Sequence, residues 1–101
     1  MTAGPFDDID PKLTIFALAN GMDLNKTGGV RRLEWYRDGH DRGILITAGS
    51  GGSLAVVAQA WKTGDEASLR STPVREDVAS EELVASFTSL LEQGLEAANS
   101  L

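Results

Sequence analysis

Residues 43–61 read GILITAGSGGSLAVVAQAW and contain two apolar segments on either side of a glycine-rich stretch. The first, 43–48, is short and rich in branched side chains, which is typical of a strand. The second, 54–61, is also short and lies between turn signals, so we predict a second strand. The alternative is a helix over 54–62 capped by Ser53, because the following apolar residues share one helical face: Leu54, Val57, Ala58 and Trp61.

The segments on both sides of this stretch also indicate antiparallel strands. Val30–Arg37 has a mixed strand pattern and runs into Asp38-Gly39, a strong signal for a hairpin turn. After residue 61, Gly64-Asp65 marks a further turn. Residues 67–72 are predicted to form another strand, which ends at Pro73 because proline carries no N–H for the ladder.

The end of the sequence carries the clearest helical pattern. Apolar residues recur at helical spacing, and the residues between them are mostly polar. The apolar positions are Leu83, Val84, Phe87, Leu90, Leu91, Gly94, Leu95 and Ala98. Ser80 is the predicted N-cap, with Glu81 and Glu82 at the positive end of the helix dipole. We therefore predict one amphipathic helix, in which Gly94 permits a close approach to the sheet.

Residues 11–20 allow two interpretations. Asp10-Pro11 suits a helix N-cap followed by the first helical residue, and Asn20-Gly21 suits a helix end, so a short helix is favoured. The apolar run 13–19 also fits a strand that turns at Asn20-Gly21.

Together these elements predict an α+β fold, with strands followed by a helix rather than alternating βαβ units. The expected architecture is an antiparallel sheet of three to five strands, with the C-terminal helix packed on one face and a short N-terminal helix. The length of 101 residues fits a single domain, 1–101, in which we expect 1–9 to form a flexible N-terminal segment.

Composition narrows the function classes. The net charge is −6, which argues against nucleic-acid binding, and the sequence holds no cysteine. Most of the basic residues lie within 26–62, where Trp35, Tyr36 and Trp61 could add a stacking surface, but we expect the tryptophans to anchor the core. No apolar run is long enough to span a membrane, and the acidic start does not fit a secretory signal, so we expect a cytoplasmic protein.

One stretch matches a metal-binding motif. The sequence Asp23-Leu-Asn-Lys-Thr-Gly-Gly-Val-Arg-Arg-Leu-Glu34 resembles the calcium loop of the EF-hand family. The resemblance implies that the ion ligands would be Asp23, Asn25, Thr27, the carbonyl of Gly29, and Glu34. Arg31 and Arg32 lie within the same stretch and would repel a cation. We therefore interpret it as a polar loop, with the ion site as the alternative.

Other candidate sites are less complete. The cluster 49–53 follows an apolar strand, but it lacks the remaining residues of a phosphate-binding loop or of a nucleophile elbow around Ser50. Asp38, His40 and Asp41 could touch a metal, although a solvated turn is the commoner role of such a cluster. We expect no cofactor, and we interpret 49–53 as a flexible strand connection.

The strand patterns favour an interaction module. If 43–48 and 54–61 are strands, both faces of the central sheet are largely apolar, whereas a sheet with one wet face usually alternates apolar and polar residues. The C-terminal helix covers one face, and the other needs either 13–18 or a second protein. We predict a non-catalytic protein-interaction module that forms a homodimer or binds another protein partner. A small-ligand or calcium-binding protein using Asp23–Glu34 is the alternative, and an enzyme of unknown reaction is a further one.

Overall fold

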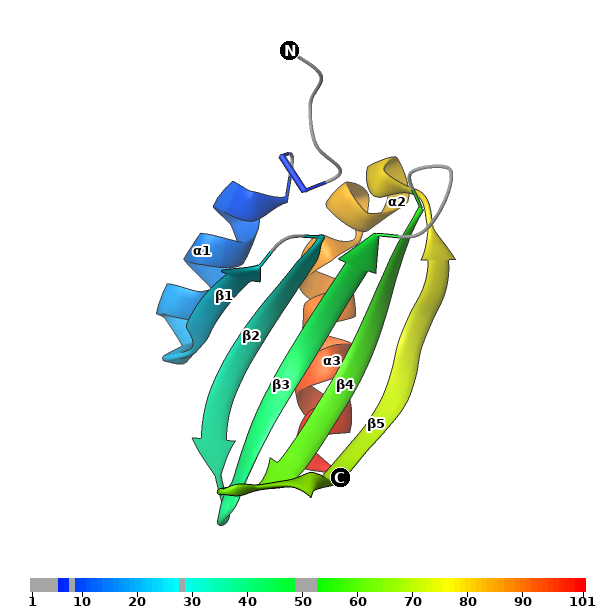
Figure 1. The fold of residues 1–101 in the computed structure, drawn as a ribbon. Helices are drawn as coiled ribbons and strands as arrows, with labels where there is room; N and C mark the ends of the chain where they lie inside the picture. Colours follow the sequence, from blue (N-terminus) through cyan, green and yellow to red (C-terminus); the bar gives the residue numbers. More distant parts are fainter. Residues whose placement is uncertain (1–5, 8, 28, 49–52) are drawn as a thin grey trace.

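Two helical regions flank a five-stranded sheet in a computed structural model, which describes residues 6–7, 9–27, 29–48 and 53–101 (Figure 1). In chain order, the elements are α1 Asp10–Asn20, β1 Asp23–Thr27, β2 Val30–Arg37, β3 His40–Ala48, β4 Leu54–Lys62, β5 Asp65–Val78, α2 Ser80–Ala85 and α3 Phe87–Asn99. The predicted α+β fold and its antiparallel sheet are confirmed. None of the described helices is both long and apolar enough to cross a membrane.

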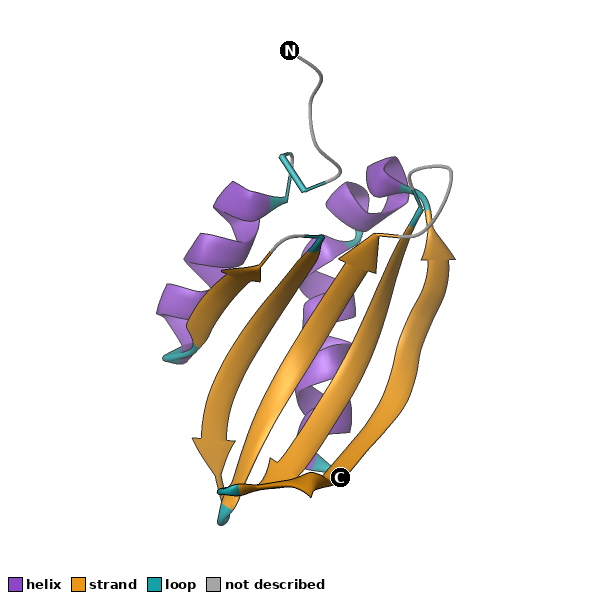
Figure 2. Ribbon diagram, viewed as in Figure 1, coloured by secondary structure: helices purple, strands orange, loops and turns teal. Residues whose placement is uncertain are grey.

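The sheet is a simple meander with the strand order β1-β2-β3-β4-β5, and all neighbours are antiparallel (Figure 2). The turn between β2 and β3 consists of Asp38 and Gly39, with φ angles of 54° and 78°. Two successive positive φ values are typical of the type I′ turn, whose twist matches that of paired strands. The predicted hairpin at Asp38-Gly39 is therefore confirmed.

The strand predictions need one correction. Residues 54–62 form β4, so the strand interpretation is confirmed and the helical alternative is wrong. The predicted end of the last strand at Pro73 is also wrong, because β5 continues to Val78. β5 lies at the edge of the sheet, where only one side of the strand is paired, and an edge strand tolerates a residue without an N–H.

The short N-terminal helix is confirmed as α1, although its cap is displaced by one residue. Asp10 is already helical, and the N-cap position is occupied by Ile9, which offers no side-chain hydrogen bond. At the other end, Gly21 has a φ of 65° and its N–H donates to the carbonyl of Ala17. Glycine is favoured at this left-handed position because it has no Cβ to clash with the preceding turn.

The predicted single C-terminal helix is divided in two. Ser86 lies between α2 and α3 with φ −110° and ψ 19°, outside the α-helical region, and this interrupts the helix just before Phe87. Ser80 was expected as the N-cap, but it is the first helical residue, and the cap position falls on Ala79 with an extended backbone. The apolar positions from Phe87 onward keep their helical spacing within α3.

A single core lies between the sheet and the helices. α1 and α3 pack on the same face, which we call the covered face; in Figure 1 both helices lie behind the strands. The core is formed by buried apolar residues from the helices and the sheet, among them Ile9, Leu13, Leu33, Ile44, Ile46, Leu54, Val56, Val78, Leu83, Phe87, Leu90 and Leu91. Phe6 and Ile9, within the segment expected to be flexible, are both buried here.

Gly94 brings α3 close to the sheet, as its position in the apolar pattern predicts. A methyl group on Gly94 would lie 3.2 Å from the Cγ1 and Cδ1 atoms of Ile44 in β3. Contacts this short are tighter than ordinary packing, so a side chain at position 94 would require Ile44 to shift by a few tenths of an ångström.

Polar side chains hold the C-terminal end of α3 against the covered face. Arg42, which is 5% exposed, donates hydrogen bonds to the carbonyls of Ala98 in α3 and Arg37 in β2. The Trp35 indole N–H donates to Oδ1 of Asn99 at 3.0 Å. These bonds satisfy buried groups that would otherwise lose their solvation, and they fix the position of the C-terminal end of α3.

Candidate binding site on the open face of the sheet

The second face of the sheet has no helix over it among the described residues. We call it the open face and define it from the strand register, because directly paired residues point to the same side. Its central members are Arg32, Glu34 and Tyr36 in β2, Asp41, Gly43, Leu45 and Thr47 in β3, Ala55, Val57, Gln59 and Trp61 in β4, and Ser71 and Pro73 in β5. Residues 13–18 belong to α1 on the covered face, so they do not cover this one.

Arg32 lies across the open face rather than pointing away from it. A methyl group on Gly43 would lie 3.5 Å from both Cγ and Cδ of Arg32, so the aliphatic part of the arginine passes over β3 at the glycine. The guanidinium carbon then reaches a position 5.7 Å from the centre of the Trp61 ring in β4. This distance is within the range of a cation–π interaction.

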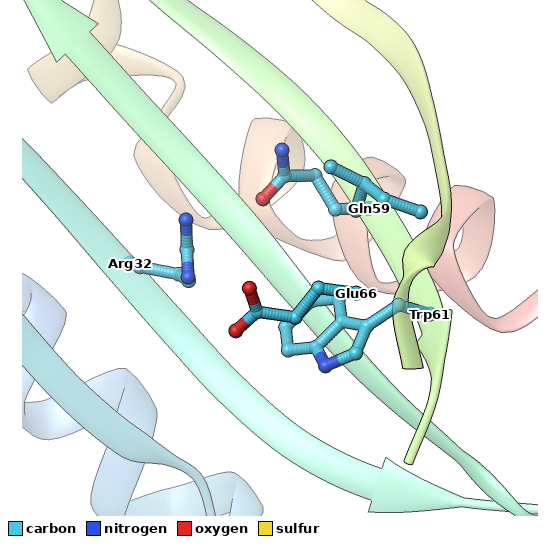
Figure 3. A pocket seen from close by; sticks show the side chains of 5 residues that line it. Arg32, Gln59, Trp61 and Glu66 are labelled. Carbon is cyan, nitrogen blue, oxygen red and sulfur yellow. The ribbon is translucent and has the colours of Figure 1, made fainter. Parts of the chain in front are cut away.

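A hollow of about 270 Å³ lies where Arg32 crosses toward β4 and β5. Its lining consists of Arg32, Gln59, Trp61, Glu66 and Leu69 (Figure 3). Figure 3 shows the Gln59 carboxamide oxygen and the Glu66 carboxylate turned toward the side on which Arg32 lies. Three strands thus bring a cation, an amide, a carboxylate and two apolar side chains into one site, which we call the Arg32 pocket.

Two buried polar atoms of the Arg32 pocket have no hydrogen-bond partner among the described residues. They are Nε of Arg32 and Oε1 of Gln59, and each is shielded from solvent. Gln59 as a whole is only 7% exposed. Buried donors and acceptors are usually paired, and leaving one unpaired costs about 1–3 kcal/mol. The Arg32 pocket therefore contains one hydrogen-bond donor and one acceptor that a ligand could satisfy.

Two carboxylates lie near the single cation of the Arg32 pocket. One guanidinium nitrogen, Nη1 of Arg32, donates to Oε1 of Glu34 at 3.3 Å, and both side chains are partly exposed. Glu66 is exposed and makes no ion pair with a described residue. Arg32 and Glu66 consequently present opposite charges to the same hollow.

The residues that match the calcium loop form the β1–β2 hairpin and not a loop. Asp23–Thr27 forms β1 and pairs with β2, so Asp23 lies opposite Glu34. Along an extended strand, loop positions 1 and 5 are about 13 Å apart, whereas calcium takes its oxygen ligands at 2.3–2.6 Å. The Thr27 hydroxyl instead donates to Oδ1 of Asn25 at 2.6 Å, and Gly29 begins the return toward β2. The structure does not bring these oxygens around one point.

The other sequence candidates are also separated. Asp38 lies in the hairpin turn, Asp41 is on the open face, and His40 is on the covered side, with Nδ1 3.1 Å from the carbonyl oxygen of Asp38. Residues 49–52 of the glycine cluster, including Ser50, lie outside the described residues. The described part of the chain contains no group of three or more His, Cys, Asp or Glu side chains placed to hold a metal.

The three aromatic residues of the alternative stacking surface, Trp35, Tyr36 and Trp61, are divided between the two faces. Trp35 packs against the core on the covered face, as expected of a core anchor. Tyr36 is 65% exposed on the open face, and Trp61 lines the Arg32 pocket. The expectation that tryptophans serve the core is therefore correct for Trp35 and wrong for Trp61.

Sequence reasoning missed Gln59, Glu66 and Leu69 of the pocket lining, and Gly43, over which Arg32 lies. Signals were present for two of them, since Gln59 is the one polar side chain in LAVVAQAW and Gly43 begins the apolar segment 43–48 without a side chain of its own. A second hollow, of about 540 Å³, has a basic lining that includes His40, Lys62 and Arg70 near the end of the covered face. Comparison of the chain with models of protein families, with curated proteins and with solved structures gives no match.

Proposed function

We propose that this protein is a non-catalytic interaction module that binds through its open face, and that the partner is a second copy of the chain. One observation carries the proposal: the open face is without helical cover in the described structure, yet it displays apolar side chains. Leu45, Val57 and Trp61 are only partly buried, although Ile44 and Ile46 beside them are fully buried. Exposed apolar patches mark interaction sites on soluble proteins.

The size of the open face supports pairing with a second sheet. Five strands at a spacing of about 4.8 Å and eight residues of about 3.4 Å rise give an area of roughly 650 Å². A specific interface of standard size buries about 800 Å² on each partner. Sheets that pack face to face do so about 10 Å apart, and a two-fold dimer is the commonest closed assembly. The estimated area lies toward the lower end of the range for specific interfaces, about 600–1,000 Å² per partner, so the open face is large enough for a second copy.

Sedimentation equilibrium between micromolar and hundred-micromolar concentration tests this proposal. We expect the average mass to rise toward twice that of the chain. Val57→Glu places a charge in the middle of the open face and should keep the protein monomeric. Leu18→Glu is the matched control, because Leu18 is 79% exposed on α1 and lies outside the face. A single monomer mass for the wild type over the whole range would overturn the homodimer.

We also propose a cytoplasmic location. The acidic N-terminal sequence, which does not fit a secretory signal, supports it. Fractionation of the native host, with detection of the protein in each fraction, is the direct measurement. Recovery from the extracellular or envelope fraction would contradict this location.

A further inference from the structure

We infer that the Arg32 pocket binds a free apolar α-amino acid in its zwitterionic form. The inference goes beyond the proposed interaction function and does not rest on it, because it concerns a small ligand in one part of the open face. It starts from the pairing of a cation and a carboxylate around two buried polar atoms without partners. Each chemical group of such a ligand meets a complementary group in the pocket.

Arg32 provides the site for the ligand carboxylate. Nη1 of Arg32 donates to Glu34. On the other edge of the guanidinium, formed by Nε and Nη2, Nε has no hydrogen-bond partner among the described residues. Two adjacent N–H groups of a guanidinium match the two oxygens of a carboxylate and form a bidentate, charge-assisted pair. The aliphatic part of the arginine lies over Gly43 and its head lies near Trp61. Because Nε is shielded from solvent, the guanidinium must turn toward the hollow for both groups to reach the ligand.

Gln59 and Glu66 provide the site for the ligand ammonium group. Oε1 of Gln59 is a buried acceptor without a donor, and Glu66 is a carboxylate without a described ion-pair partner. An ammonium group carries three donors and no acceptor, so it can serve both. The terminal torsion of a glutamine side chain has a broad energy minimum, so a small rotation presents Oε1 to the ligand.

Charge and size select this ligand class over simpler ions. A bare anion would meet Glu66, and a bare cation would meet Arg32, whereas a zwitterion pairs with both. The hollow of about 270 Å³ is slightly smaller than the 300–1,000 Å³ typical of pockets for drug-sized molecules, which favours a small ligand. Trp61 and Leu69 form the apolar part of the lining, so we expect leucine or phenylalanine to bind better than glycine.

The test is isothermal titration calorimetry of the full chain with L-leucine, L-phenylalanine and glycine. N-acetyl-L-leucine and L-leucinamide are the matched probes, since the first lacks the ammonium group and the second lacks the carboxylate. We expect saturable binding of leucine and a loss of about tenfold or more in affinity for each derivative. Glycine should bind more weakly than leucine because it gains no contact with Trp61.

Variants assign the two charges separately. Glu66→Gln should weaken leucine binding but should not weaken the binding of N-acetyl-L-leucine, because Glu66 attracts the ammonium group and repels a bare anion. Arg32→Gln should abolish binding of both. Asp23→Asn is the control for a charge change on the open face outside the pocket. Circular dichroism on each variant confirms that a lost heat signal is not lost folding.

Two results would overturn the inference. One is the absence of any saturable heat with the three amino acids at millimolar concentration in the folded wild-type protein. The other is equal affinity for leucine and both derivatives, which would show that the charged groups are not recognised. Sedimentation of the same samples separates this inference from the homodimer. A monomer that binds leucine contradicts only the pairing, and a dimer that ignores leucine contradicts only the ligand.

Discussion

The two faces of the sheet are built from neighbouring residues of the same strands, yet their surroundings differ completely. In β3, Ile44 and Ile46 are fully buried beneath the helices, whereas Leu45 between them is only partly buried on the open face. The three side chains are chemically similar, and the two-residue period of a strand alone decides which face each joins. An apolar side chain in a strand is therefore not sufficient to predict burial. The position of the helices decides which of the two apolar faces remains accessible.

The largest expected effect is the difference in stability between truncating an aromatic side chain on the covered face and truncating one of similar size on the open face. Phe87 is 5% exposed at the start of α3, and Phe87→Ala should lower the free energy of unfolding by about 3–5 kcal/mol because truncation leaves a cavity. Tyr36→Ala on the open face should cost the monomer much less, since Tyr36 is 65% exposed. Urea unfolding of both variants makes the comparison. A midpoint for Phe87→Ala near that of the wild type would show that α3 is not docked.

The second prediction compares two arginines of the covered side. Arg42→Met should destabilise the protein by about 2–3 kcal/mol, because it removes the donors for the carbonyls of Ala98 and Arg37 in a buried site. Arg37→Met is the control, since Arg37 is exposed and its contact with Asp38 is a surface ion pair at 3.5 Å. We expect a change below about 0.5 kcal/mol for the control. Thermal and urea unfolding of both variants make the comparison. Equal decreases in the free energy of unfolding for Arg42→Met and Arg37→Met would contradict the anchoring role of Arg42.

The third prediction concerns the close contact between α3 and β3. Alanine at position 94 gains about 1 kcal/mol of helix propensity but lies 3.2 Å from atoms of the fully buried Ile44. Because overpacking a core costs about 1–3 kcal/mol, Gly94→Ala should destabilise the wild type by about 1 kcal/mol. In an Ile44→Ala background the same substitution should be stabilising, which a double-mutant cycle of unfolding free energies measures. The same sign in both backgrounds would show that contact with Ile44 is not the cause.

The smallest expected effect concerns the β1–β2 hairpin at the edge of the sheet. Millimolar calcium should leave the melting temperature unchanged, because the oxygens of Asp23, Asn25 and Thr27 are spread along a strand and a bound ion would stabilise the fold by mass action. Thermal unfolding with and without calcium is the measurement. A saturable increase that disappears in Glu34→Gln would instead assign an ion site to this hairpin.

Much of the fold can be predicted from local sequence because local physics determines it. The two-residue period of β3 and β4, the Asp38-Gly39 turn and the helical spacing after Phe87 each depend on neighbours within a few residues. The predictions that are wrong depend on what lies further away. β5 passes Pro73 because it is an edge strand, and only the order of strands in the sheet reveals that.

The Arg32 pocket cannot be predicted from the spacing of residues along the sequence. Arg32, Gly43, Gln59 and Glu66 occupy four different strands, and only the register of those strands brings them together. A one-residue shift of register would move each side chain to the other face. Polar residues inside an apolar run can be noticed in the sequence, but their partners are unknown until the strand pairing is fixed.

Pro73 has a consequence for how the protein avoids aggregation. β5 is a long edge strand, and such edges are templates onto which further strands can add to build fibrils. Pro73 has no N–H to offer an incoming strand, and Asp77, with a φ of 52°, bends the backbone away from a regular ladder. Charged residues on both sides of these positions, Arg70, Arg75 and Glu76, add a further obstacle. These features oppose the addition of a further strand at the β5 edge of the sheet.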